Sequence, residues 1–268
     1  DRNVFNALKA NHSLGWTARP SVYYTINPQA GPQLVRDKIL ADRGLKSSMP
    51  PQGRAARYAH RDAKINEYLL SNLTRKLHLG AGPNVLDGWL NTDIAPQTND
   101  VMAINVTAPL PFADETFDFV YSEHLIEHLS LEQGVRLVKE LFRITRPGAI
   151  IRMATPDLEK MLSLFTKDPS AIQQKYVDWT TRTFIGAIEG YNPALVLNNM
   201  FYNWGHRFIY DPGMLAAVMQ NAGFTDLKSQ PTGRSDHSPL NDIETHGGAI
   251  GAPDMADYET MAIEARRP

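Results

Sequence analysis

The sequence contains no cysteine among its 268 residues. This absence excludes a disulfide framework, a cysteine metal site and a cysteine nucleophile. It fits the reducing cytoplasm, and we expect the protein to be cytoplasmic. No apolar run is long enough to span a bilayer and no signal-peptide pattern is present, so we expect no membrane partner.

A charge excess of either sign is also missing. The chain carries 27 basic and 29 acidic side chains, for a net charge of -2. Domains that bind nucleic acid usually carry a clear basic excess, so we expect no nucleic-acid partner. The content of 43% hydrophobic and 21% charged residues is ordinary for a globular protein. The expected partner is a small-molecule substrate. These features are also compatible with a homo-oligomer.

The chain divides into segments of different composition. Residues 1–57 are rich in proline, glycine and arginine, which predicts an N-terminal extension. Residues 58–268 form the predicted main domain. Within it, an aromatic-rich insertion at about 157–205 is either additional core or a lid or dimer contact. The segment 231–257 is long for a loop in a compact domain, and such loops are usually functional or disordered.

Short apolar strands alternate with helical patterns along the main domain. The best-marked helix begins with a capping box, Ser130 with Gln133, and ends before Pro147-Gly148. The predicted helices span about 58–73, 131–146 and 212–222. The predicted strands are 76–79, 89–94, 101–106, 117–121, 149–154, 226–229 and 258–265. This alternation predicts an α/β fold, with a mainly parallel sheet and helices on its faces.

A glycine turn follows the first strand at Gly80-Ala81-Gly82, and a carboxylate, Asp93, closes the second. Such a turn lets the backbone approach a nucleotide, and such a carboxylate can accept both ribose hydroxyls. Alternatively, Asp93 only caps a surface turn. The short spacing between Gly82 and Asp93 leaves no room for a full helix, and a third glycine is missing. A dinucleotide would lose the helix N-terminus that holds its pyrophosphate, so S-adenosylmethionine is the better candidate.

These motifs resemble those of class I S-adenosylmethionine-dependent methyltransferases. Residues 77–82 and 88–93 resemble the family's first two motifs, and Arg146-Pro147-Gly148-Ala149 its turn into strand five. Residues 110–129 are more specific and resemble the fourth-strand region of small-molecule methyltransferases, including those of ubiquinone biosynthesis. The resemblance covers residues 76–155 well and 206–265 loosely.

The resemblance implies a Rossmann-like fold with a seven-stranded sheet, helices on both faces, and S-adenosylmethionine as the cofactor. It implies methyl transfer to oxygen or nitrogen of a small molecule or sugar. The compact first motif and the Gly88-Trp89 pair are similar to a bacterial subgroup linked to surface-polysaccharide or natural-product biosynthesis. The implied cofactor-binding residues are Gly80, Ala81, Gly82, Asp93, Ile94, Asn105, Val106 and Ser122. Asn105 stands where the family usually has an acidic residue, and its side chain would form a hydrogen bond with the adenine amine.

An oxygen acceptor also needs a base, and histidine titrates in the useful range. His124 follows the fourth strand at the edge where α/β sheets bind ligands, with Glu123 beside it, and both are candidate catalytic residues. Alternatively, the pair only caps the next helix or lines the cofactor pocket. His206 is a third candidate catalytic residue, and it would enter the pocket from the side of the insertion. Alternatively, it belongs to a surface pair that flanks the next helix. His128 matches a packing position of the family.

Other features stay open. His237, Glu244 and His246 fit no helix-based metal motif, so we expect no metal site. The basic stretch 36–64 is either a solvated face or a site for an anionic substrate group. If it binds substrate, charge reversal at Arg54, Arg57 and Arg61 would raise KM for substrate and leave cofactor affinity unchanged. The competing functions are a non-catalytic S-adenosylmethionine-binding protein and an NAD-dependent Rossmann enzyme.

Overall fold

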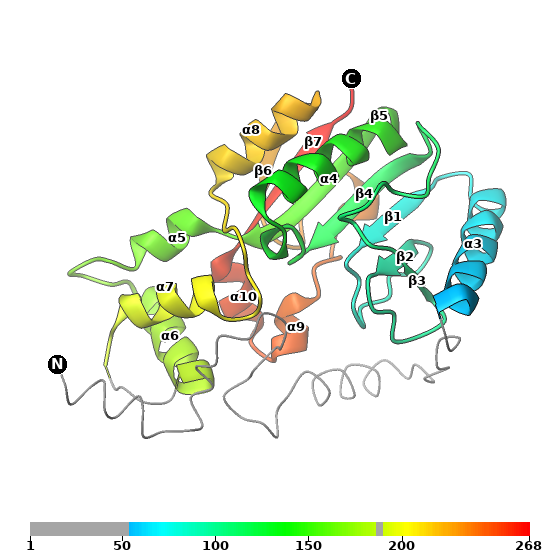
Figure 1. Cartoon of the computed structure of the whole chain (residues 1–268). Helices are drawn as coiled ribbons and strands as arrows, with labels where there is room; N and C mark the ends of the chain where they lie inside the picture. Colours follow the sequence, from blue (N-terminus) through cyan, green and yellow to red (C-terminus); the bar gives the residue numbers. More distant parts are fainter. Residues whose placement is uncertain (1–53, 186–189) are drawn as a thin grey trace.

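The computed structural model describes residues 54–185 and 190–268. In this part of the chain, a seven-stranded sheet runs in the order β3-β2-β1-β4-β5-β7-β6 (Figure 1). Its strands are β1 (Lys76–Leu79), β2 (Leu90–Asp93), β3 (Val101–Ala103), β4 (Phe117–Glu123), β5 (Thr145–Pro156), β6 (Thr225–Gln230) and β7 (Thr260–Arg266). Neighbouring strands from β3 to β5 are parallel, whereas β7 runs antiparallel to both β5 and β6. The predicted mainly parallel sheet, with a hairpin-like pair at one edge, is confirmed.

Strand β5 is longer than predicted. It begins at Thr145 rather than at residue 149, because Thr145 pairs with Phe117 before the register shifts and Ile150 pairs with Phe119. Pro147-Gly148 therefore forms an irregular stretch inside the strand. Proline tolerates such a position because it has no N–H to give to the ladder.

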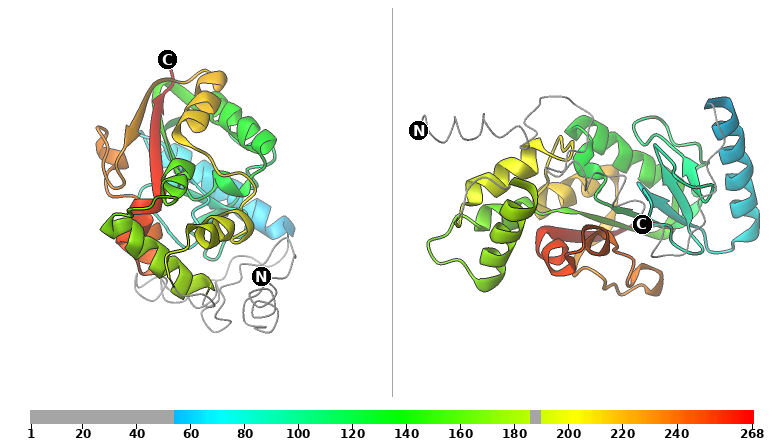
Figure 2. Two further views of the ribbon diagram at one scale, coloured as in Figure 1. Left: turned by 90° about the vertical axis from the view of Figure 1, so that its left-hand side faces the viewer. Right: turned by 90° about the horizontal axis from the view of Figure 1, so that it is seen from below.

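Two helices cover one face of the sheet, α4 (Leu131–Ile144) and α8 (Pro212–Ala222) (Figures 1 and 2). The capping box of α4 forms as predicted: Ser130 Oγ accepts from Gln133 N, and Gln133 Oε1 accepts from Ser130 N. Asp211 caps α8, and Gly223 ends it with a left-handed φ of 110°. Four apolar side chains of α4 are completely buried and anchor this layer in the core: Leu137, Val138, Leu141 and Ile144.

The second face of the sheet is covered differently from the first. Among the described residues, a small cluster covers it, made of Trp89, Tyr121, Ile150, Leu240 and Ile243. The last two belong to the segment 231–245, which lies on the opposite side of the sheet from α4 and α8 (Figure 2). This segment contains only a short 3-10 turn, η5 (Ser238–Leu240).

A buried ion cluster holds that segment in place. The side chain of Arg152, on β5, is fully buried. It donates to Glu244 at 2.6 Å and to Glu264 at 2.8 Å. Its guanidinium also donates to the backbone carbonyls of Arg234 and Pro231. The long late segment is therefore fixed to the sheet by one arginine.

The aromatic-rich insertion forms a second small core beside the carboxyl ends of the strands (Figure 1). It contains α5 (Leu158–Ser163), α6 (Ala171–Thr180), a π-helical turn η4 (Thr181–Ile185) and α7 (Pro193–Tyr202). The late helices α9 (His246–Ile250) and α10 (Pro253–Glu259) pack alongside. The insertion thus lies where open α/β sheets bind their ligands.

Helix α3 (Arg54–Ser71) begins four residues before the predicted helix and packs beside β3. It lies at the other end of the molecule from α6 and α7 (Figures 1 and 2). Arg61 contacts its neighbour Asp62 at 2.7 Å. Residues 36–53 of the basic stretch lie outside the described residues, so substrate binding there stays a prediction. Within the described part, no helix is both long and apolar enough to cross a membrane.

We predict that Arg152→Leu lowers the free energy of unfolding by about 3–5 kcal/mol, because it leaves two buried carboxylates without their cation. Urea unfolding measures the change. The matched control is Arg136→Leu, in which both members of the lost pair are exposed (61% and 80%); it is expected to change stability by no more than about 0.5 kcal/mol. Equal effects of the two substitutions would contradict the assigned role of Arg152.

Candidate active site

The glycine turn after β1 leaves one side open. Gly80 and Gly82 have left-handed φ angles of 68° and 50°. A Cβ on Gly80 would lie 3.0 Å from the Leu125 side chain, whereas a Cβ on Gly82 would meet nothing within 4 Å. Gly80 is thus needed for close packing inside the protein, and Gly82 leaves a cradle for a ligand. Ala81 N donates to Thr92 O and fixes the turn to β2.

Asp93 lies beside this turn. Its carboxylate accepts hydrogen bonds from Gly82 N at 3.0 Å and from Ala95 N at 2.7 Å. Asp93 therefore does cap a turn, as the alternative interpretation held. A carboxylate has about four acceptor positions, so two remain for a pair of ribose hydroxyls. The chain between Gly82 and Leu90 forms turns and no helix, as the spacing predicted.

Four further predicted cofactor residues border the same edge. Ile94 is 69% exposed, which is unusual for isoleucine and fits the apolar contact that an adenine ring needs. Asn105 is exposed, but its side-chain oxygen already accepts from Thr107 N and Oγ1. Its amide nitrogen, rather than its oxygen, would then meet the base, which changes the contact predicted for the adenine amine. Val106 is half-buried, and Ser122 is buried in β4.

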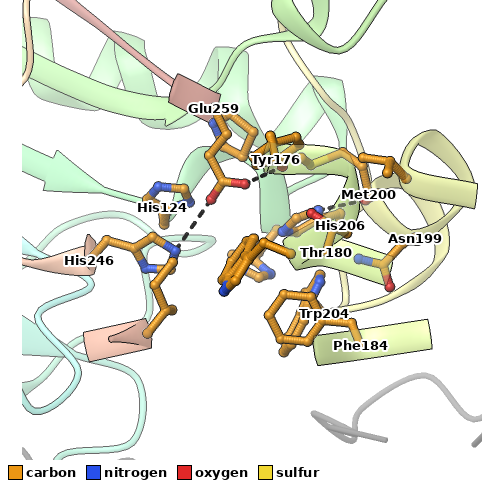
Figure 3. Close-up of a pocket in the computed structure, with 15 residues that line it drawn as sticks. His124, Tyr176, Thr180, Phe184, Asn199, Met200, Trp204, His206, His246 and Glu259 are labelled. Atoms are coloured by element: carbon orange, nitrogen blue, oxygen red, sulfur yellow. Dashed lines mark hydrogen bonds and ion pairs between the residues drawn. The ribbon is translucent and has the colours of Figure 1, made fainter. Parts of the chain in front are cut away.

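A cavity of about 250 Å³ opens at the carboxyl edge of the sheet, between the sheet and the insertion (Figure 3). Its polar end contains His124, His128, His206, His246 and Glu259. Its apolar wall contains Tyr176, Trp179, Phe184 and Trp204. One residue links the glycine turn to the cavity lining: Leu125 packs on Gly80 and directly follows His124, which lines the cavity.

His124 adopts a left-handed φ of 46° immediately after β4. Such backbone strain in a non-glycine residue is often found at functional sites. Its Nε2 lies 3.1 Å from Thr260 Oγ1, and its Nδ1 lies 3.2 Å from Glu127 Oε1. Its ring is stacked on that of His246, with centroids 3.8 Å apart. Both ring nitrogens therefore already have protein partners.

The charge state of His124 also disfavours a role as base. Burial lowers its pKa, but contact with the Glu127 carboxylate, aided by the charges of Glu259 and Glu123, outweighs burial and raises the pKa to about 9. Burial likewise raises the pKa of Glu127, but contact with His124 outweighs it and holds that pKa at about 2. This histidine is thus a positively charged partner of Glu127 at neutral pH.

Glu123 is occupied by the late segment. Its carboxylate accepts from Thr245 N and from His246 N, at 2.9 and 3.0 Å. It thereby positions His246 at the edge of the cavity, which fits the capping interpretation better than a catalytic one.

His206 lies at the cavity wall, as predicted for entry from the insertion (Figure 3). Its Nδ1 lies 2.7 Å from Met200 O. A carbonyl only accepts, so Nδ1 carries the proton and Nε2 keeps its lone pair. Burial lowers the pKa of His206 to about 4, although the Glu127 charge acts in the opposite direction.

The sequence-based assignment missed Glu127 and took His128 only as a packing residue. Glu127 is completely buried, and Thr155 Oγ1 donates to its Oε2 at 2.9 Å. Its backbone carbonyl accepts from Arg207 N and Phe208 N, which fixes the neighbouring His206 next to His128. One sequence signal was available. The Glu-His dipeptide occurs twice, at 123–124 and 127–128, and a spacing of four residues suits one face of a helical turn.

Comparison with known proteins supports the resemblance found in the sequence. Residues 85–153 match the family model described as Methyltransferase domain. This match spans β2, β3, β4 and most of β5, and it supports the resemblance to class I S-adenosylmethionine-dependent methyltransferases. The protein is therefore a methyltransferase, and its cofactor is S-adenosylmethionine. No curated protein matches the chain.

Several solved structures are similar at low sequence identity. A methyltransferase from Archaeoglobus fulgidus is 15% identical, with a TM-score of 0.42 over 79% of this chain and 94% of its own. A Thermotoga maritima methyltransferase, titled a possible histamine N-methyltransferase, is 17% identical, with a TM-score of 0.43 over 88% and 99%. A possible exported protein from Bordetella parapertussis is 12% identical, with a TM-score of 0.45 over 100% and 96%. Likeness at this level does not transfer a substrate.

We predict that Asp93→Ala weakens binding of S-adenosylhomocysteine by at least about 10-fold, because the ribose hydroxyls lose a charged acceptor. Isothermal titration calorimetry measures the affinity, and thermal melting verifies that the variant is folded. Asp100→Ala is the matched control, since Asp100 is an exposed carboxylate before the amino end of β3. Unchanged affinity in a folded Asp93→Ala protein would show that Asp93 only caps its turn.

Proposed function

We propose that this methyltransferase transfers a methyl group to an oxygen or nitrogen atom of a small molecule or sugar, which binds in the histidine-lined cavity. The setting we propose is natural-product or surface-polysaccharide biosynthesis in the cytoplasm. One observation carries the proposal: the cavity begins at His124, and the next residue, Leu125, packs on the cofactor turn at Gly80. The cofactor cradle and the cavity thus share one short segment of chain.

The cofactor supplies the reactive group. When bound, S-adenosylmethionine supplies an electrophilic methyl group on a sulfonium, so the protein has to bind, align and exclude water. Gly82 and Asp93 provide the cradle for the adenosyl end. The exposed Ile94 provides an apolar surface for the base.

The shape and lining of the cavity favour a compact acceptor with one apolar face. Trp179, Phe184 and Trp204 form a chain of edge-to-face contacts, with centroids 5.1 and 4.7 Å apart. Such aromatic walls bind the flat face of a ring or a sugar and exclude water from the site. His124, His246 and Glu259 lie together on one side of the cavity, whereas Phe184, Trp204 and the polar Asn199 lie on the other (Figure 3).

His206 is the residue that we propose meets the acceptor atom. Because Nδ1 is held by Met200 O, its Nε2 lone pair can receive a hydrogen bond from an acceptor O–H or N–H. His124 and Glu123 are positioning residues in this proposal. The first is held between Glu127 and Thr260, and the second holds the backbone of Thr245 and His246.

The reaction is tested with S-adenosylmethionine that carries a deuterated methyl group. The purified chain is incubated with this cofactor and a fractionated small-molecule extract, and products are detected by mass spectrometry. The expected result is labelled small molecules together with S-adenosylhomocysteine. If S-adenosylmethionine binds and no labelled product forms in any fraction, the chain acts as a non-catalytic binder and the proposal fails.

With the labelled acceptor in hand, we predict that His206→Ala lowers kcat by about 100-fold or more, as expected for loss of a positioned proton acceptor. Affinity for S-adenosylhomocysteine should stay within about 2-fold, because His206 lies at the acceptor end. His60→Ala is the control, since His60 contacts Asn99 O beside α3 and lies away from the cavity. A normal kcat in His206→Ala would overturn the role assigned to this residue.

A further inference from the structure

Among the described residues, two groups of possible metal ligands lie at the cavity, and all of their members except the buried Glu127 line it. One comprises His124, His246 and Glu259, and the other comprises Glu127, His128 and His206. In each group the potential ligand atoms lie within 4.8 Å of one another. The spacing of these residues along the sequence matches no metal motif, because each group joins segments that only the fold brings together.

The first group is poorly arranged for a metal ion. The rings of His124 and His246 are stacked, with only 23° between their planes. A metal ion lies near the plane of each imidazole that binds it, and two nearly parallel rings cannot both direct a lone pair at one point. Both nitrogens of His124 also have protein partners, Glu127 and Thr260.

The second group is better arranged for a metal ion. The rings of His128 and His206 are inclined by 65°, with centroids 5.0 Å apart, so their nitrogens can converge. Metal ligands at about 2.1 Å from one ion lie roughly 3.4 Å apart, so modest side-chain rotations would bring these groups onto one ion.

The supporting contacts also match those of metal ligands. A histidine ligand usually donates its other ring N–H to a carbonyl or carboxylate, as His206 Nδ1 does to Met200 O. A carboxylate ligand is itself hydrogen-bonded, as Glu127 Oε2 is by Thr155. The other oxygen, Glu127 Oε1, is buried and lies 3.2 Å from His124 Nδ1, yet no donor among the described residues is well directed at it. His124 is the cation that faces this oxygen in the present structure, so a metal ion would share the Glu127 carboxylate with that histidine.

We propose that Glu127, His128 and His206 bind one divalent transition-metal ion at the polar end of the acceptor cavity. Two imidazoles and one carboxylate suit zinc and its neighbours in the first row, whereas magnesium and calcium prefer oxygen ligands throughout. Three protein ligands leave a coordination position open, as in catalytic zinc sites. The open position would face the cavity that His128 and His206 line.

This site deepens the proposed function, and its catalytic use rests on that function. An acceptor hydroxyl bound at the open position would lose its proton to water, and the oxygen would keep the electron pair. The metal–oxygen bond then replaces the direct hydrogen bond to His206 Nε2. The inferred acceptor atom is therefore oxygen, in a hydroxyl or phenol group.

Metal binding is tested without cofactor or acceptor, on the full chain freed of metal by a chelator. Zn²⁺ is titrated by calorimetry, and Co²⁺ is added as a spectroscopic reporter of a mixed nitrogen–oxygen site. We expect one Zn²⁺ per chain and cobalt absorption bands in the visible range. Loss of an outer-shell partner costs about 10–100-fold in metal affinity, so loss of a ligand in His206→Ala or Glu127→Gln should cost at least about 100-fold. Circular dichroism verifies folding, and His128→Ala is a third variant in case Glu127→Gln does not fold.

His246→Ala, which alters only the first group, should bind Zn²⁺ within about 3-fold of the unaltered chain, because additive behaviour is expected where no ligand is shared. The proposal is overturned if the unaltered chain binds no Zn²⁺, if folded His206→Ala binds it equally well, or if only His246→Ala loses it. Labelled product from a chain that binds no metal would leave the proposed function standing. Metal binding by a chain that yields no labelled product would leave the metal site standing and contradict the proposed function.

Discussion

A single buried residue, Glu127, connects the sheet to the segment that follows the insertion. Glu127 is inaccessible to solvent, and it contacts His124 from the turn after β4 and Thr155 from β5. Its backbone carbonyl accepts hydrogen bonds from the N–H groups of Arg207 and Phe208. These bonds hold the chain where it returns from the insertion to the sheet. A buried charge is tolerated only with compensating partners. The arrangement of histidines around the cavity therefore depends on this one residue.

The neighbouring backbone links the glycine turn to the segment that lines the cavity. His124 takes a left-handed conformation directly after β4, and Leu125 then packs on Gly80. A side chain at Gly80 would crowd Leu125 and push apart the turn and the segment that carries the histidines. In the proposed function, the close approach of these two loops would give the methyl donor and the acceptor a common boundary, which an in-line transfer requires.

The fold was largely predictable because its signals are local. The capping box at Ser130 and the glycine turn at 80–82 each depend on a few adjacent residues, and they appear where the sequence placed them. The candidate site was predictable only in part. His206 approaches Glu127 and His128 through hydrogen bonds between segments about 80 residues apart, and no local pattern encodes that contact. The position of the segment 231–245 on the second face could not be predicted for the same reason, since it depends on a hydrogen bond between Arg152 and Glu244, which are 92 residues apart.

The central claim is that the cradle at Gly82 and Asp93 and the histidine-lined cavity form one active site. Its most direct test is a crystal structure of the chain with a cofactor analogue that carries an amine in place of the transferable methyl group. The account predicts that both ribose hydroxyls bind Asp93 and that the amine points into the cavity toward His206. A nucleoside bound away from Asp93, or an amine directed away from the histidines, would contradict it.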